Sequence, residues 1–155
     1  MNPNRNHLDR PIVVALYIRV STEEQAEYVY SIDAQKQALR QYCEETNRVV
    51  YEVYCDCGKN GTRPEKRDAL QRLLCDAQNG LFQEVIVWKI NRLARRAFDL
   101  LKIVNKLTDH QVGFRSITES HFDTTTSIGK FSLQMLGALA DLERQQCFMN
   151  RRSKC

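Results

Sequence analysis

Several features are missing from this chain of 155 residues, and each absence excludes a class of protein. No apolar run approaches the roughly 20 residues that a membrane-spanning helix needs, so we expect no membrane association. The stretch MNPNRNHLDRP at the start is polar and lacks the apolar core of a signal peptide. We therefore expect residues 1–11 to form a short disordered lead and the protein to be cytoplasmic.

Motifs for metals and nucleotides are missing as well. The chain has six cysteines but only three histidines, and no CxxC pair occurs. A single residue separates Cys55 from Cys57, which is poor spacing for a zinc site, so we expect reduced thiols. Neither G-x-x-x-x-G-K-[ST] nor G-x-G-x-x-G occurs, which argues against a nucleotide-binding α/β domain.

The composition that is present is that of one ordinary globular domain. Hydrophobic residues make up 43% of the chain and charged residues 27%, and this length corresponds to about one domain. The formal net charge of +4 is modest and only suggests an anionic partner. The placement of the arginines is therefore more informative than their number.

Strand-like and helix-like segments alternate along most of the chain. Apolar, β-prone stretches occupy residues 12–20, 48–56, 82–90 and 112–118, and helical periodicity occupies residues 31–47, 68–80 and 91–111. This alternation predicts an α/β domain over residues 12–127, with a mostly parallel central sheet flanked by helices. Functional side chains should gather at the carboxyl ends of its strands.

The last segment, residues 128–155, has apolar residues close to a three-four spacing. This pattern predicts a long amphipathic helix of coiled-coil character. It could pack on its own sheet, but it is longer than a small sheet can cover, which favours a subunit interface. The chain stops soon after it at Arg151–Cys155, which looks like an interruption of the helix.

A serine and an arginine stand together at the end of the first predicted strand, in LYIRVSTEEQ. Arg19 and Ser21 are two residues apart and would project to the same side. A serine is a weak nucleophile unless another group activates it. The histidines lie outside any motif and G-x-S-x-G is absent, so a Ser-His-Asp triad is not expected.

Arginines are abundant near the predicted strand ends. They are Arg19, Arg63, Arg67, Arg92, Arg95 and Arg96, with Arg144 in the last helix. On one helix beginning near Asn91, Arg92 and Arg95 would share a face at an amino end that favours anions. Each arginine alone could be a solvated surface charge. Several converging on one phosphodiester would stabilise a pentacoordinate transition state without a metal.

Four stretches together resemble the catalytic domain of serine site-specific recombinases, the resolvase and invertase family. They are YIRVSTEEQ, SIDAQ, VWKINRLARR and FDTTTSIGKFSLQMLGALADLER. The similarity runs from residue 12 almost to the end of the chain. The SIDAQ segment and the extended loop in DCGKNGTRPEKRDALQRLL are most similar to the large serine recombinases, which include phage integrases and conjugative transposon enzymes.

The resemblance implies DNA recombination through a covalent intermediate. Ser21 matches the nucleophile that forms a 5′-phosphoserine link, and the other matching site residues are Arg19, Arg67, Arg92 and Arg95, with Gln25 and Gln35 as polar organisers. Arg144 matches an arginine of the long helix, through which family members form dimers and tetramers on double-stranded DNA. No cofactor and no metal are implied. Against the family pattern, no DNA-binding region follows residues 128–155, so we expect the interface helix to be truncated before such a region.

The chain departs from the family at Asn91, where relatives usually have aspartate. An amide keeps the shape but removes the charge, so reduced activity is one expectation. A catalytically impaired assembly module is therefore an alternative to an active recombinase. A serine transposase with the same chemistry is a second alternative that this sequence leaves open.

Overall fold

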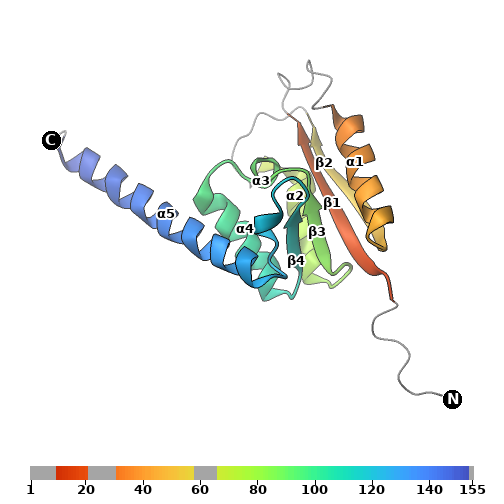
Figure 1. Ribbon diagram of the computed structural model, residues 1–155. Helices are drawn as coiled ribbons and strands as arrows, with labels where there is room; N and C mark the ends of the chain where they lie inside the picture. The colour runs from red at the N-terminus through yellow and green to blue at the C-terminus, as the bar shows by residue number, and fades with distance from the viewer. Residues whose placement is uncertain (1–9, 21–30, 58–65, 154–155) are drawn as a thin grey trace.

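The computed structural model describes residues 10–20, 31–57 and 66–153. Its strands are β1 (Ile12–Val20), β2 (Arg48–Cys57), β3 (Glu84–Val87) and β4 (Gly113–Ser116). They form a four-stranded sheet in the order β2-β1-β3-β4, in which every pairing is parallel. The predicted parallel α/β architecture is confirmed (Figure 1).

Helices cover both faces of this sheet (Figure 1). Ala15 and Tyr17 of β1 face a core built with α2 (Asp68–Gln78) and α4 (Ala97–Asp109). Leu16 and Ile18 face the opposite side, which α1 (Ile32–Glu45) covers. Because alternate residues of β1 are buried on opposite faces, the strand is a continuous apolar run.

Two predicted helix boundaries are explained by local chemistry. Ser31 precedes α1, and its Oγ accepts a hydrogen bond from the Ala34 N–H at 3.1 Å, which satisfies a donor at the helix start. After α2 the chain turns at Gly80, whose φ of 71° lies in the left-handed region that glycine adopts without strain. Both helices therefore lie where the periodicity places them.

The single helix predicted over residues 91–111 is wrong. The segment divides into α3 (Ile90–Leu93) and α4, with an extended backbone at Ala94 and Arg96. The carbonyl groups at the end of α3 accept hydrogen bonds from arginine side chains instead of from the next helical turn. Arg92 and Arg95 therefore do not share one helix face.

The long final helix is confirmed as α5 (Ser127–Arg152), which follows a short 3₁₀ turn, η4 (Ser120–Phe122). Its N-terminal part packs along α4, and its C-terminal end extends away from the body (Figure 1). Near the start of α5, Gly129 packs directly against the backbone of Asp123. An added Cβ would lie 1.6 Å from the Asp123 carbonyl oxygen, so only glycine fits there. Among the described residues, no helix is long and apolar enough to cross a membrane.

The cysteines differ from one another in the structure. The sulfur atoms of Cys55 and Cys57 lie together near the end of β2, so this pair is placed to form a disulfide, which the expectation of reduced thiols did not include. Cys43, Cys75 and Cys147 have free thiols.

Candidate active site at the carboxyl ends of the strands

Three buried polar side chains form a network near the carboxyl ends of β1 and β2. The Tyr17 hydroxyl donates to Asp56 Oδ2 at 2.8 Å. The Tyr17 hydroxyl oxygen also accepts hydrogen bonds from Arg67 Nε at 3.0 Å and from Arg67 Nη2 at 2.6 Å. A buried guanidinium and a buried carboxylate are thus joined through one phenol, which offsets the cost of removing both charges from water.

Asp56 also fixes the start of α2. Its Oδ1 and Oδ2 accept from the main-chain N–H groups of Ala69 and Leu70, each at 3.0 Å. These are two of the N–H groups that a helix start leaves without an intrahelical partner. Because Arg67 immediately precedes α2, the carboxylate holds Arg67 in place through both the backbone and Tyr17.

The carbonyl end of α3 binds two guanidinium groups. Arg19 donates from Nη2 to the Asn91 carbonyl oxygen at 2.9 Å and from Nε to that of Arg92 at 3.2 Å. Arg67 donates from Nη1 to the Leu93 carbonyl oxygen at 2.6 Å and from Nη2 to that of Arg92 at 3.2 Å. Cations are favoured at helix carboxyl ends, so this short turn positions both arginines.

Positive charge converges on Arg19. Burial lowers the pKa of Arg19, and the charges of Arg67, Arg95 and Arg92 lower it further. Its side chain is 2% exposed, and its Nη1 has no hydrogen-bond partner within the described part of the chain. A group of like charges with a spare buried donor is suited to an anionic ligand.

The structure thus brings together several of the arginines predicted from the sequence. Arg19, Arg67 and Arg92 are buried around α3, and Arg92 Nη1 lies 3.5 Å from the Arg19 carbonyl oxygen. Arg95 is exposed in the connection to α4, close enough for its charge to affect Arg19. Ser21, Gln25 and Arg63 lie outside the described residues.

Three further predicted residues lie at different places. Asn91 is exposed, and its contact with Arg19 is made by the main-chain carbonyl. Gln35 is buried on α1, the helix on the opposite face of the sheet from Tyr17. The guanidinium of Arg144, on α5, stacks on the ring of Phe98 with Cζ 3.7 Å from the ring centroid.

Sequence reasoning missed Tyr17 and Asp56 as members of this network. Tyr17 stands two residues before Arg19 and therefore shares its side of the strand, which is a signal that could have identified it. Asp56 is a carboxylate next to the last residue of β2, and it pairs in register with Arg19 of β1. A charged residue at such a buried position needs a partner, which is a second usable signal.

Solved structures with the same architecture include recombinase catalytic domains. The N-terminal catalytic domain of TP901-1 integrase has 38% sequence identity and a TM-score of 0.79, over 86% of this chain and 98% of that one. A resolvase family site-specific recombinase from Streptococcus pneumoniae has 29% identity and a TM-score of 0.79, over 93% and 95%. The resemblance to phage integrases and resolvases is confirmed.

Curated relatives agree with this likeness. Serine recombinase gin of Escherichia phage Mu is 34% identical over 129 residues, which cover 83% of this chain and 58% of that protein. DNA-invertase hin of Salmonella typhimurium is 33% identical over 131 residues, which cover 83% and 60%. The chain therefore spans less than two thirds of the length of these relatives. The family model described as "Resolvase, N terminal domain" matches residues 14–154, so the chain belongs to the resolvase N-terminal domain family.

Proposed function

We propose that this chain is the catalytic domain of a site-specific DNA recombinase, with Ser21 as the nucleophile. The observation that carries the proposal is the convergence of Arg19, Arg67, Arg92 and Arg95 at the end of β1. Ser21 follows β1 directly in the sequence. A DNA phosphodiester is the anion that such a cluster would meet in this family.

The proposed reaction is a phosphoryl transfer that exchanges one ester for another. The Ser21 oxygen attacks phosphorus and loses its proton, and a new O–P bond forms. The bond between phosphorus and the 3′ oxygen breaks, and that oxygen takes up a proton as a free 3′ hydroxyl. The 5′ phosphate stays linked to serine, and the reverse reaction with another 3′ hydroxyl rejoins the DNA.

The arginines would stabilise the charge that builds up on the phosphoryl oxygens. Donors already fixed in position stabilise developing charge without reorganising during the reaction. Arg19 Nη1 has no hydrogen-bond partner among the residues that the structure describes, while its Nε and Nη2 are held by α3. Arg67 is held on several sides by Tyr17 and α3. The exposed Arg95 can move onto the phosphate when DNA binds.

The substitution at Asn91 is compatible with activity. The main-chain carbonyl of Asn91, and not its side chain, orients Arg19. Any residue at this position supplies the same carbonyl. This contact favours an active recombinase over an impaired assembly module.

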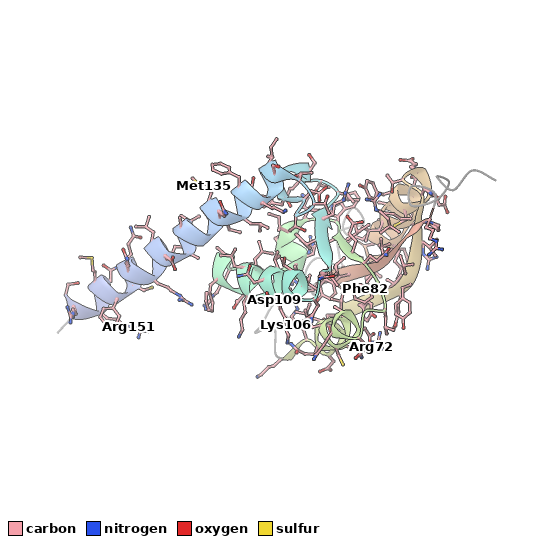
Figure 2. All side chains as sticks on the ribbon, turned by 90° about the horizontal axis from the view of Figure 1, so that it is seen from below. Arg72, Phe82, Lys106, Asp109, Met135 and Arg151 are labelled. Carbon is pink, nitrogen blue, oxygen red and sulfur yellow. A yellow bond between two sulfur atoms is a disulfide. The ribbon has the colours of Figure 1, made fainter. Side chains whose placement is uncertain are left out.

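Residues 12–127 would form the catalytic part and residues 128–155 an interface helix for dimers and tetramers on double-stranded DNA. Four apolar residues recur on α5 at seven-residue intervals, each more than half exposed: Ile128, Met135, Leu142 and Met149. Met135 lies on the side of α5 away from α4 in Figure 2. A repeating exposed apolar stripe on a helix is suited to pairing with another helix.

Covalent trapping tests the proposal. The chain is fused to a DNA-binding module of known site and incubated with labelled DNA that is nicked beside that site. Denaturing gels should show a protein–DNA adduct with the wild-type sequence and none with Ser21→Ala. A bound, folded wild-type fusion that forms no adduct would contradict the proposal.

A further inference from the structure

Glu119 lies outside the arginine network but contacts the element on which that network depends. It follows β4, and its Oε2 accepts a hydrogen bond from the Ile90 N–H at 2.8 Å. Ile90 is the first residue of α3, the turn whose carbonyls hold Arg19 and Arg67. A residue 29 positions later in the chain thus caps the start of this turn.

The residue that immediately precedes α3 does not cap it. The N-cap residue Lys89 makes no side-chain hydrogen bond that caps the helix, and an ammonium group has no acceptor to offer an N–H. A turn of four residues also has few internal hydrogen bonds of its own, so its stability depends on groups outside it. The Glu119 carboxylate supplies both an acceptor and a negative charge at the end of α3 where anions are favoured.

The position of Glu119 is itself fixed by hydrogen bonds at the carboxyl ends of β3 and β4. The buried Ser116 hydroxyl lies 3.2 Å from Glu119 Oε2 and 3.3 Å from the Trp88 carbonyl oxygen, within donating distance of either. Thr118 donates to that Trp88 carbonyl oxygen from Oγ1 at 2.7 Å and from its N–H at 3.2 Å. The segment carrying Glu119 is therefore bound to the residues that lead into α3.

We propose that Glu119 is a positioning residue for the recombinase reaction, which acts by fixing α3 and thereby the guanidinium groups of Arg19 and Arg67. Opposite ends of α3 are held by different groups: the carboxylate binds the first N–H, and the two arginines bind the carbonyls of Asn91, Arg92 and Leu93. A shift of α3 would move both guanidinium groups at once. This inference rests on the proposed function for its effect on rate, but its structural part can be measured without DNA.

The structural part is tested by NMR of the Nε–H signals of Arg19 and Arg67 in the 155-residue chain. Glu119→Ala removes the acceptor for Ile90, so both signals should shift or broaden. Glu119→Gln keeps an oxygen that can accept from Ile90, so its spectrum should stay close to wild type. The matched control is Glu44→Ala, which removes an exposed glutamate from α1 on the opposite face of the sheet.

The catalytic part is tested by the rate of adduct formation at saturating DNA in a single turnover. Glu119→Ala should slow the rate about tenfold to a hundredfold, because small displacements of catalytic groups cost about that much. DNA affinity should stay unchanged, and Glu119→Gln should restore most of the rate. In an Arg19→Lys background, Glu119→Ala should cost much less, because both changes act on the same contact.

The possible results distinguish the positioning role of Glu119 from the proposed recombinase function. Unshifted arginine signals together with a wild-type rate in Glu119→Ala would overturn the positioning role. Shifted signals in a protein whose wild type forms no adduct would leave the positioning intact and contradict the proposed function. If Glu119→Ala does not fold, Glu119→Asp keeps the charge but shortens its reach, and its arginine signals should shift in the same direction.

Discussion

The guanidinium of Arg67 donates from two nitrogens to the single hydroxyl oxygen of Tyr17, at 3.0 and 2.6 Å, and its Cζ lies 5.2 Å from the centre of the Tyr17 ring. That hydroxyl in turn donates to Asp56. The phenol therefore separates a buried cation from a buried anion and gives each a hydrogen bond. This relationship makes Tyr17 a structural requirement for the arginine site.

Tyr17→Phe should destabilise the protein by about 1–3 kcal/mol, because it removes the acceptor of the buried Arg67 Nε and one of the donors to Asp56 Oδ2. The free energy of unfolding from urea titration measures the effect. Tyr51→Phe is the matched control, since Tyr51 is exposed on β2, and it should change stability by less than about 0.5 kcal/mol. Equal effects of the two substitutions would show that the Tyr17 hydroxyl contributes nothing.

Arg92→Ala and Arg95→Ala should differ in what they damage. Arg92 is 3% exposed and Arg95 is exposed, so Arg92→Ala should lower both stability and cleavage. Arg95→Ala should slow cleavage by about a hundredfold, as loss of a charge-stabilising donor does. Its midpoint of thermal unfolding should stay near wild type. A large loss of thermal stability in Arg95→Ala would show that this residue is structural.

Asn91→Asp should raise the rate of adduct formation, because it places a carboxylate beside the arginines where family members usually have one. Its thermal stability should hardly change, since residue 91 is exposed and contacts Arg19 through the main chain. The measurement compares single-turnover rates of the two proteins on the same nicked DNA. Identical rates would mean that the side chain at this position is irrelevant to cleavage.

Met135→Lys and Leu142→Lys should weaken self-association without unfolding the chain, because both side chains are exposed on the apolar stripe of α5. Sedimentation velocity over a range of concentrations measures the effect. Gln37→Lys adds the same charge to an exposed position of α1 and is the matched control. Association that survives both α5 substitutions would place the subunit interface elsewhere.

Most of the fold could be predicted because it follows from local periodicity. Apolar strands and amphipathic helices occur where the sequence predicts them, and Ser31 marks the start of α1. The break after Leu93 could not be predicted in this way, because the helical pattern continues through it. Arg19 and Arg67, which come from other elements, take the carbonyls of α3 and so end the turn.

The site was predictable in its residue types more than in its geometry. Arginines near strand ends indicated an anion site, and the structure buries three of them around α3. Tyr17 was hidden in an apolar run, where an aromatic residue is usually core. The role of Asp56 depends on how β2 meets the start of α2, which is a tertiary contact that no local pattern encodes.

The most direct test is to identify the residue that becomes attached to DNA. The trapped adduct is digested with nuclease and trypsin, and the nucleotide-bearing peptide is sequenced by mass spectrometry. We expect a nucleotide on Ser21 within the tryptic peptide of residues 20–36, and no modified peptide from Ser21→Ala. A nucleotide on any other residue, or an adduct that persists in Ser21→Ala, would contradict it.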